Sequence, residues 1–572
     1  FIISKGIFAM KIVYTPNLYW KYAPPAKPEF GDVLSLSSNN WDDYGYKTSL
    51  NAKIYISNEL ISFDFSIKLL IENIDNTANK LDELCKGGWN GVFPIPNTNY
   101  IALPSDIDFY KILISKIGEN ETIILLNELH DAGFTFNINH DKNTEALIET
   151  DAFKTSLLRE GGSSKAFQDG YLIFNNILSE IRDFQLNIIA KDEHVRTVPF
   201  KFTSSLLPYD INVIIGPNGI GKSHCLKSLV EYWLQTGMGD FSVLNENKHT
   251  PFDERPNISK LVLVSYSPFE DFNLDMENNN LQDKQAYQYF GFRQKRDDGS
   301  IGISRNLPAL NSSNSLIEMI YDDEKYKFIK GRINKLNTIN NVLKSAIDYE
   351  QCALKLKSSE HPTFFHDQAI PINGEQFFLA KDISTWIPNI DLLREACSLN
   401  DGVIFIKNDQ IVPLSSGQRL FAYIVINVVA SIKDNSLIVI DEPELFLHPT
   451  LEIEFVGLLK KILKPFRSKA ILATHSLSIT REVPSKCVHI FHDEGEGLEI
   501  LPPPFETFGG NVQRISSYVF GDKSISKPFD EWLEMQLQDI GDPEKLIEML
   551  NEEINEEIIM KIMSLGKKYH GH

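Results

Sequence analysis

The feature that most limits the possible folds is the octapeptide Gly216-Pro217-Asn218-Gly219-Ile220-Gly221-Lys222-Ser223. It has the spacing G-x-x-x-x-G-K-[ST], follows the apolar run 211–215 and precedes a run compatible with a helix. Glycines let the backbone turn so that consecutive N–H groups face one anion, and the following helix adds the positive end of its dipole. The segment therefore predicts a strand, a phosphate-binding loop and a helix, which together begin an α/β domain.

Two side chains at the end of the octapeptide have the chemistry expected for ATP with Mg²⁺. The Lys222 ammonium is suited to bridge the β- and γ-phosphates, and the Ser223 hydroxyl is suited to coordinate the metal. All eight residues from Gly216 to Ser223 are therefore candidate ATP-binding residues. The motif alone does not identify the class of nucleotide hydrolase.

A second candidate phosphate-binding element, Leu414-Ser415-Ser416-Gly417-Gln418-Arg419, precedes the apolar stretch 420–432. That stretch has 13 residues, fewer than the roughly 20 that span a bilayer, so a buried helix is expected. The Ser415 hydroxyl and nearby N–H groups would then lie at a helix N-terminus, which suits an anion. Ser415, Gly417 and Gln418 are candidate nucleotide-binding residues.

Two adjacent carboxylates, Asp441 and Glu442, follow the apolar run 437–440. We expect Asp441 to hold Mg²⁺ together with Ser223, and Glu442 to polarise the attacking water. A solvated turn is the alternative interpretation. It is disfavoured because a buried strand directs these carboxylates to the carboxyl edge of a sheet, where ligands bind.

One histidine, His475, ends another apolar run at 470–474. A lone histidine usually has a structural role. The position of His475 after a second buried strand instead favours contact with the γ-phosphate or with the water. His475, Glu442 and Lys222 are therefore the candidate catalytic residues.

Together these segments resemble the ABC ATPase superfamily, and within it the soluble branch of SMC proteins, RecF and OLD-family ATPases. The sequences Asp-Glu-Pro-Glu-Leu-Phe-Leu-His-Pro at 441–449 and Ala-Thr-His-Ser at 473–476 carry the resemblance. It implies a head-to-tail dimer in which Ser415 and Gly417 of one subunit close over the ATP held by Lys222 of the other. It also implies that residues 447–449 lie where subunits communicate.

The chain departs from the family pattern at two places. Ser416 stands where the commonest signature has glycine, a change that leaves phosphate binding plausible. No glutamine follows the predicted strand 261–265, where the family has its Q-loop; Ser267 is the candidate replacement for a metal or water contact.

The order of the motifs predicts three parts. Residues 1–185 are expected to form an α+β domain, with two β-rich runs within 53–73 and a helix that begins near Asp106. Residues 186–505 are expected to form an ABC-type P-loop ATPase domain of the α/β class, with a mostly parallel sheet and a helical insert at about 275–400. Residues 506–572 are expected to be helical.

Individual elements can also be predicted. Strands are expected at 184–190, 199–203 and 403–406, the last of them within the parallel sheet. Residues 543–563 are expected to form one amphipathic helix, because five isoleucine and leucine residues recur at spacings of three and four. These residues are Ile547, Leu550, Ile554, Ile558 and Ile562.

The formal net charge of −21 opposes general attraction to nucleic acid, since phosphate contacts depend on Lys and Arg. Any nucleic-acid contact is expected to be local, in the basic stretches 293–296, 325–335 or 460–469, although a solvated surface is their more common meaning. The five cysteines lie far apart, which fits a reducing cytoplasm. We expect a cytoplasmic protein without a membrane partner.

Three functions remain open. The first is an ATP-driven switch or clamp in a prokaryotic DNA-maintenance or anti-phage complex, similar to the ATPases of Septu, Gabija and retron-associated systems. It would control a separate nuclease. The nuclease domains of OLD-like proteins need an Asp-x-Asp pair to hold metal ions, and the chain's one Asp-x-Asp sequence, at 106–108, has the position of a helix start instead. A transporter ATPase subunit is disfavoured by the long segment 223–414. A nucleotide-gated scaffold with little hydrolysis is disfavoured by Glu442 and His475.

Overall fold

The computed structural model describes residues 10–18, 22–236, 238–274, 286–357, 369–447, 449–493, 495, 497–520 and 528–570. The chain divides into two compact units, Phe1–Gly510 and Asn511–His572. Among the helices in these ranges, none has the length and apolar character needed to cross a bilayer.

The N-terminal part of the first unit is an α+β domain, as the sequence predicts. Its five-stranded sheet has the order β1-β2-β3-β4-β5, in which β1 and β2 are parallel and the other pairs antiparallel. The strands are β1 (Lys11–Thr15), β2 (Val33–Ser38), β3 (Ser49–Ile56), β4 (Glu59–Ile71) and β5 (Tyr100–Pro104). The helices are α1 (Thr77–Lys86), α2 (Asp108–Ile117), α3 (Glu119–Leu129), α4 (Ala132–Asn137), α5 (Lys142–Ile148) and α6 (Gly161–Asp169). The two predicted β-rich runs are the hairpin β3–β4.

The long strand β4 buries a charged residue among apolar ones. Ile67 and Leu69 lie in the domain's hydrophobic core, and Lys68 between them faces the other side of the sheet. The Lys68 ammonium pairs there with Asp43, at 3.1 Å, and with Glu160. Buried charges need partners, and these contacts attach the segment before α6 to the sheet.

The predicted ATPase domain is built on a seven-stranded sheet with the order β10-β9-β18-β19-β8-β20-β21. Six strands are parallel and only the edge strand β21 is antiparallel, which confirms the predicted α/β class. The strands are β8 (Ile211–Ile215), β9 (Leu261–Ser265), β10 (Tyr287–Gly291), β18 (Leu437–Asp441), β19 (Lys469–Thr474), β20 (Val488–His492) and β21 (Glu499–Leu501).

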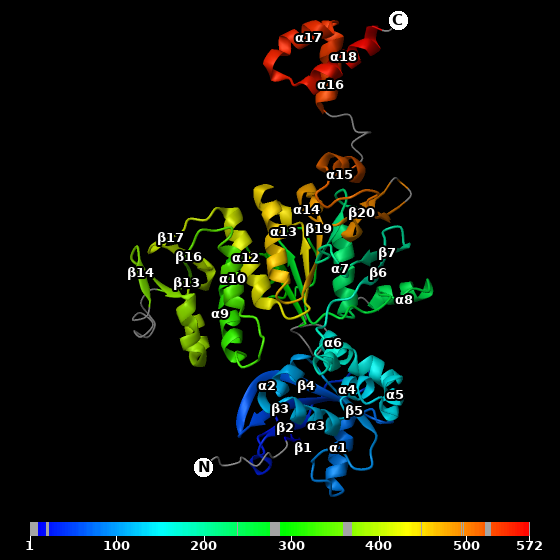
Figure 1. The fold of residues 1–572 in the computed structure, drawn as a ribbon, viewed down its shortest axis with the longest axis vertical. Helices are drawn as coiled ribbons and strands as arrows, with labels where there is room; N and C mark the ends of the chain where they lie inside the picture. The colour runs from blue at the N-terminus through cyan, green and yellow to red at the C-terminus, as the bar shows by residue number, and fades with distance from the viewer. Residues whose placement is uncertain are drawn as a thin grey trace. The chain divides into compact units, whose positions relative to one another are not determined.

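Helices cover both faces of this sheet (Figure 1). Helix α7 (Lys222–Trp233) lies on one face, and α12 (Ser416–Ser431) and α13 (Pro449–Leu463) lie on the other. Strand β18 shows the alternation that this layering requires: Leu437 and Val439 join the core beneath α7, and Ile440 faces α12 and α13. By the same alternation Asp441 lies on the α7 face. Shorter helices are α8 (Met238–Glu246) and α14 (Leu477–Arg481).

An antiparallel ribbon precedes the ATPase sheet. It pairs β6 (Phe184–Ile189) with β7 (Val195–Phe200), so the second strand lies earlier than the predicted 199–203. The reason is that the N–H groups of Phe202 and Thr203 donate to the Asp183 carboxylate, which takes the chain out of the ladder.

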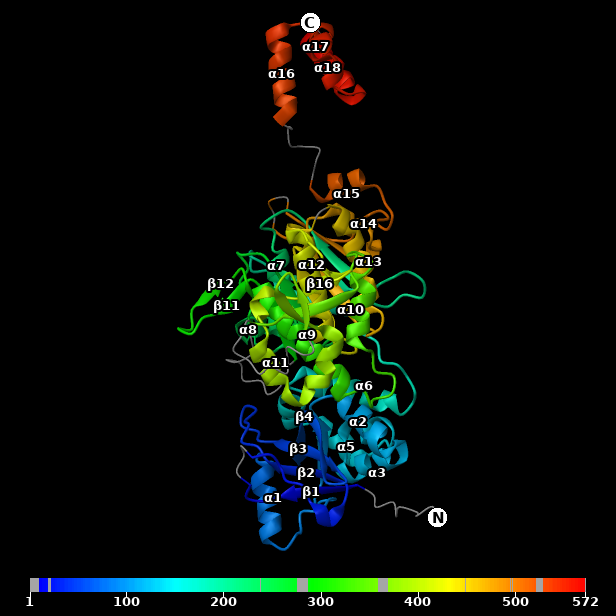
Figure 2. The ribbon, with the colours of Figure 1, turned by 90° about the vertical axis from the view of Figure 1, so that its left-hand side faces the viewer.

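The insert is not only helical. It contains α9 (Leu307–Lys325), α10 (Lys335–Leu343) and α11 (Ile390–Ala396), and also a five-stranded antiparallel sheet. That sheet has the order β14-β15-β13-β16-β17, formed by β13 (Gln351–Lys355), β14 (Ile370–Ile372), β15 (Glu375–Leu379), β16 (Ile404–Lys407) and β17 (Gln410–Ile411). A two-stranded ribbon of β11 (Arg293–Lys295) and β12 (Ile301–Ile303) extends from the domain (Figure 2).

The prediction that 403–406 joins the parallel sheet is therefore wrong. The strand at this position, β16, pairs antiparallel with β13 and β17. Asn408 and Asp409 both have positive φ, at 49° and 57°, which turns the chain straight back in a tight hairpin.

The second unit contains α15 (Val512–Val519), α16 (Pro528–Ile540), α17 (Pro543–Leu550) and α18 (Glu556–His570). The single helix predicted at 543–563 is interrupted at Asn551, where φ is 41°. All five predicted apolar residues nevertheless lie in or against one hydrophobic cluster. The chain folds back between two helices, and the apolar residues cover the same core from both.

Candidate functional site

The phosphate-binding loop joins β8 to α7, as predicted. At three positions of the loop a residue larger than glycine is sterically disfavoured. Gly219 and Gly221 have φ values of +76° and +109°, and a Cβ on Gly216 would lie 2.4 Å from the Phe491 carbonyl oxygen. The loop is thus packed against β20 and turned through backbone conformations that favour glycine. This shape is what lets its N–H groups gather around a phosphate.

Lys222 begins α7 and is 5% exposed. Its ammonium donates to the carbonyl oxygens of Gly216 and Pro217, each at 3.0 Å, and lies 2.8 Å from His475 Nε2. Burial lowers the pKa of Lys222 to about 8, although the nearby carboxylates of Glu442 and Asp441 act in the opposite direction. The loop carbonyls and His475 therefore hold the cation at the mouth of the loop.

Ser223 and Asp441 meet as the sequence predicts. The Ser223 hydroxyl donates to Asp441 Oδ1 at 3.1 Å. Burial and the adjacent Glu442 raise the pKa of Asp441 to about 7, although the Ser223 hydrogen bond opposes the shift. A hydroxyl and a carboxylate at this distance fit Mg²⁺, which takes one or two protein ligands and completes its shell with water and phosphate oxygens. Within the described residues, no group of three or more His, Cys, Asp and Glu side chains could hold a metal.

Glu442 has a left-handed backbone with φ of +50°. This conformation costs a non-glycine residue about 1–2 kcal/mol. It is held by the Glu442 N–H, which donates to the Ala473 carbonyl at 2.8 Å. The turn moves the side chain away from the line of β18, to a position 24% exposed and with Oε1 3.6 Å from His475 Nε2. A carboxylate that remains accessible beside a buried one can contact water.

His475 connects the two sides of the site. An ammonium can only donate, so His475 Nε2 accepts from Lys222 and the ring proton lies on Nδ1. Burial and the Lys222 charge lower the pKa of His475 to about 4, so its imidazole is neutral at neutral pH. Nε2 thus lies between Lys222 and Glu442, at 2.8 and 3.6 Å.

Glu444 is a site residue that the sequence did not identify. Its Oε2 accepts from the Thr474 hydroxyl at 2.8 Å, and its Oε1 accepts from the His475 N–H at 2.5 Å. Burial raises the pKa of Glu444, although these hydrogen bonds oppose the shift. The carboxylate therefore fixes the end of β19 from which His475 projects. Its position within Asp-Glu-Pro-Glu was the available signal.

The second candidate phosphate-binding element has the predicted helix-start geometry. Ser415 is the N-cap of α12: its hydroxyl accepts from the Gln418 N–H at 3.3 Å, and its own N–H donates to Gln418 Oε1 at 3.1 Å. Ser415 is exposed. In the ranges that the structure describes, Ser415, Gly417 and Gln418 form no hydrogen bond with the phosphate-binding loop.

Ser267 and His448 are two further residues to which the family pattern gave a predicted role. The Ser267 hydroxyl, the candidate replacement for the Q-loop glutamine, accepts from the Phe269 N–H at 3.5 Å in its own turn. His448, part of the predicted subunit contact at 447–449, lies outside the described residues.

Several cations of the predicted basic stretches have partners within the chain. Arg293 pairs with Glu270 at 2.7 Å, Arg467 with Asp434 at 2.8 Å, and Lys335 is buried. The possible nucleic-acid contact stays a prediction.

The family model described as "AAA domain, putative AbiEii toxin, Type IV TA system" matches residues 211–481. That range contains every candidate site residue described above. Residues 211–481 thus form an AAA-family ATPase domain, for which ATP binding is expected.

Similar proteins include protein ea59 of Escherichia phage lambda, which is 24% identical over 508 residues and is matched over 85% of each chain. The aligned region therefore extends beyond the domain at residues 211–481. Solved structures similar to this chain include the following two. One is the SMC head bound to the C-winged helix domain of ScpA, with 12% identity, a TM-score of 0.27, and coverage of 57% of this chain and 98% of that one. The other is UvrA2 from Deinococcus radiodurans, with 13% identity, a TM-score of 0.26, and coverage of 62% and 40%.

Proposed function

We propose that this chain binds and hydrolyses ATP and uses the cycle as a switch that controls a separate effector protein. One observation carries the proposal: Lys222, His475 and Glu442 converge beside the Ser223–Asp441 pair at the carboxyl edge of a parallel sheet. These are the groups that phosphoryl transfer to water requires, namely a phosphate-binding cation, two magnesium ligands and a carboxylate beside the attacking water.

Each residue has one task in this mechanism. The loop N–H groups and Lys222 bind the β- and γ-phosphates, and Ser223 and Asp441 would hold Mg²⁺, which would supply positive charge beside the phosphates. Glu442 orients a water and accepts its proton as the water oxygen bonds to the γ-phosphorus and the bond from that phosphorus to the bridging oxygen breaks. His475 is uncharged and lies where it can contact the γ-phosphate or that water.

The outward-facing Ser415 element supports the dimer as the working form. The element begins a 16-residue helix and Ser415 and Ser416 are exposed, so this helix N-terminus is accessible to a phosphate held by another subunit. We propose that two chains associate head to tail, with each ATP between one subunit's Lys222 and the other's Ser415.

The effector is proposed to be a separate nuclease in a DNA-maintenance or anti-phage complex. The family description, which names a putative toxin of a toxin–antitoxin system, supports a defence setting. Asp106 and Asp108 support a separate effector, because both are engaged at the start of α2: Asp106 Oδ1 accepts from the Asp108 N–H, and the carboxylates pair with Lys433 and Lys111. Metal-dependent cleavage of DNA or RNA by the purified chain would contradict this assignment.

ATP binding and turnover by the purified chain test the core of the proposal. Lys222→Ala is expected to lose ATP binding, because the cation that meets the phosphates is removed. Lys227→Ala is the matched control: it lies on the same helix and its ammonium pairs with Asp271 at 2.6 Å. If Lys222→Ala binds ATP as well as this control does, the phosphate-loop assignment is wrong.

A further inference from the structure

The turn between α12 and β18, residues 432–436, connects the two elements that carry the candidate ATP contacts. Helix α12 begins at the Ser415 cap, and β18 ends at Asp441, next to Glu442. A movement of α12 along or around its axis must therefore be absorbed in this turn or passed to β18. Whatever holds the turn acts on both ATP-contacting elements.

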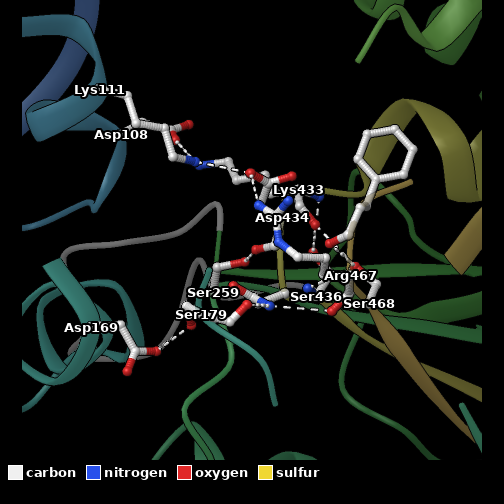
Figure 3. A network of polar contacts seen from close by, with 12 residues as sticks. Asp108, Lys111, Asp169, Ser179, Ser259, Lys433, Asp434, Ser436, Arg467 and Ser468 are labelled. Carbon is white, nitrogen blue, oxygen red and sulfur yellow. Dashed lines mark hydrogen bonds and ion pairs between the residues drawn. The ribbon is translucent and has the colours of Figure 1, made fainter. Parts of the chain in front are cut away.

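The N-terminal domain holds this turn through ion pairs. The Lys433 ammonium lies 2.7 Å from Asp106, and the Asp434 carboxylate lies 3.1 Å from the Lys111 ammonium. Lys111 also pairs with Asp108 at 2.9 Å. Figure 3 shows Lys111 and Arg467 converging on Asp434. Asp106 lies two residues before α2, and Asp108 and Lys111 lie in its first turn, so the segment at the start of α2 holds two consecutive residues of the turn.

The same turn is attached to the ATPase sheet. Arg467, just before β19, pairs with Asp434 at 2.8 Å, and the Ser259 hydroxyl, just before β9, donates to the Asp434 carbonyl at 2.5 Å. The Asn435 amide donates to the Ser179 carbonyl at 2.9 Å. The turn thus lies where the N-terminal domain, the helix α12 and the amino ends of three strands meet.

A second contact joins the N-terminal domain to the insert. Ile329, in the loop between α9 and α10, is 7% exposed and belongs to the N-terminal hydrophobic core, with Tyr326 and Phe328 packed against it. Helix α9 packs along α12, and Lys335 at the start of α10 donates to the Ala430 carbonyl near the end of α12. The N-terminal domain therefore contacts the turn after α12 directly, and it is connected to α12 itself through the insert.

The ion pairs can separate at moderate cost. They border a cavity of about 1250 Å³ that is lined by Lys111, Lys433, Asp434 and Arg467 among others. The five charged side chains Asp106, Lys111, Lys433, Asp434 and Arg467 are between 19% and 33% exposed. Partly hydrated pairs contribute far less than fully buried ones, so they can serve as a restraint that a conformational change overcomes.

We propose that the N-terminal domain restrains ATP turnover by holding the α12–β18 turn through the pairs Asp106–Lys433 and Lys111–Asp434. When Ser415 closes on ATP, α12 moves, the pairs rearrange, and the N-terminal domain registers the nucleotide state. This inference rests on the proposed ATPase function and assigns a role to the N-terminal domain.

Charge exchange across the Asp106–Lys433 pair tests the restraint. Lys433→Glu and Asp106→Lys each place like charges together and are expected to raise ATP turnover about fivefold, a typical coupling between sites. The double variant restores opposite charges and should return to the parental rate. Lys154→Glu is the control, because its exposed ammonium pairs with Glu149 at 2.9 Å and takes part in neither of the two proposed pairs. Singles with parental or lower turnover, or a double variant that stays fast, would overturn the proposal.

Hydrogen exchange in α2 gives a second readout that does not need hydrolysis. In the parent, ATP is expected to increase exchange in α2 and in residues 432–436, and the single variants should show the increased exchange without ATP. If ATP binds and leaves both segments unchanged, the coupling is refuted even when the chain is an active ATPase. If the parent binds ATP without turnover and these segments respond, hydrolysis fails and the coupling stands. Lys433→Gln and Asp106→Asn provide milder changes if a charge-reversed chain does not fold.

Discussion

At the scale of single residues, Glu442 is the side chain whose change should separate binding from hydrolysis. Glu442→Gln keeps the shape of the side chain but cannot accept the water proton. ATP binding should persist, and turnover should fall by about 10²- to 10⁴-fold, the usual loss for a general base. Equilibrium binding and steady-state turnover measure the two effects. Glu454→Gln, at an exposed position on α13, is the control; turnover equal to that control would assign the base elsewhere.

Glu444 should act by positioning His475 and not by touching the nucleotide. Glu444→Ala removes the acceptor of two hydrogen bonds from the end of β19, so kcat should fall while KM for ATP changes little. Glu444→Gln keeps one acceptor oxygen and should fall between the parent and the alanine variant. Steady-state kinetics of the three proteins test this. A rise in KM with kcat unchanged would instead place Glu444 in substrate binding.

Asp131 connects a single carboxylate to the stability of a helix start. It caps α4 by accepting from the Phe134 N–H at 2.9 Å, and the Tyr110 hydroxyl also donates to it at 2.9 Å. Burial raises the pKa of Asp131 from 3.8 to about 7. The folded state thus binds this proton more tightly than the unfolded state does. Stability should therefore fall as pH rises from about 4 to about 7 and change little beyond.

Asp131→Asn should remove this dependence, since an amide keeps the cap and carries no charge. The variant should melt a few degrees above the parent at about pH 8, with a smaller difference near pH 5. Thermal unfolding at both pH values measures this. Asp141→Asn is the matched control, because Asp141 caps α5 in the same way at a partly exposed position. A difference that stays constant with pH would show that Asp131 is not protonated in the folded protein.

At the scale of elements, the sequence predicts best where local pattern and burial agree. Strands β8, β18 and β19 are continuous apolar runs that end in polar motifs, so both the sheet and the convergence of Lys222, Asp441 and His475 follow from them. Helix α12 follows from a cap and a long apolar run. These elements contain most of the candidate site.

Elements whose pairing depends on distant segments were not predictable. Strand β16 has the same apolar character as β18, and only its antiparallel partners β13 and β17 distinguish the two. The break at Asn551 leaves the apolar spacing intact, so periodicity could not reveal it. The role of Glu444 also depends on a distant segment, because its partners Thr474 and His475 lie 30 and 31 residues later in the chain. The sequence therefore did not reveal it.

At the scale of the whole molecule, the central question is whether one chain completes its own ATP site. Lys222 and Ser415 belong to motifs at the starts of two different helices, and Ser415 is exposed. The proposed head-to-tail dimer predicts that ATP stabilises association, most clearly in Glu442→Gln, where the closed state is not consumed by hydrolysis. Sedimentation with and without ATP measures this association, and an unchanged monomer would contradict the dimer.

Mixing two inactive variants tests the dimer at the level of catalysis. Lys222→Ala lacks the phosphate cation, and Ser415→Arg blocks the element that closes over the partner's ATP, so each protein alone should be inactive. In a mixed dimer, the intact Lys222 of one subunit faces the intact Ser415 of the other and forms one complete site. With random pairing at equal amounts, half of the dimers are mixed and each has one site in two, so about a quarter of parental turnover should return. If each chain completed its own site, every site would carry one of the two lesions. The mixture would then stay inactive at every ratio, even when labelled subunits are seen to exchange.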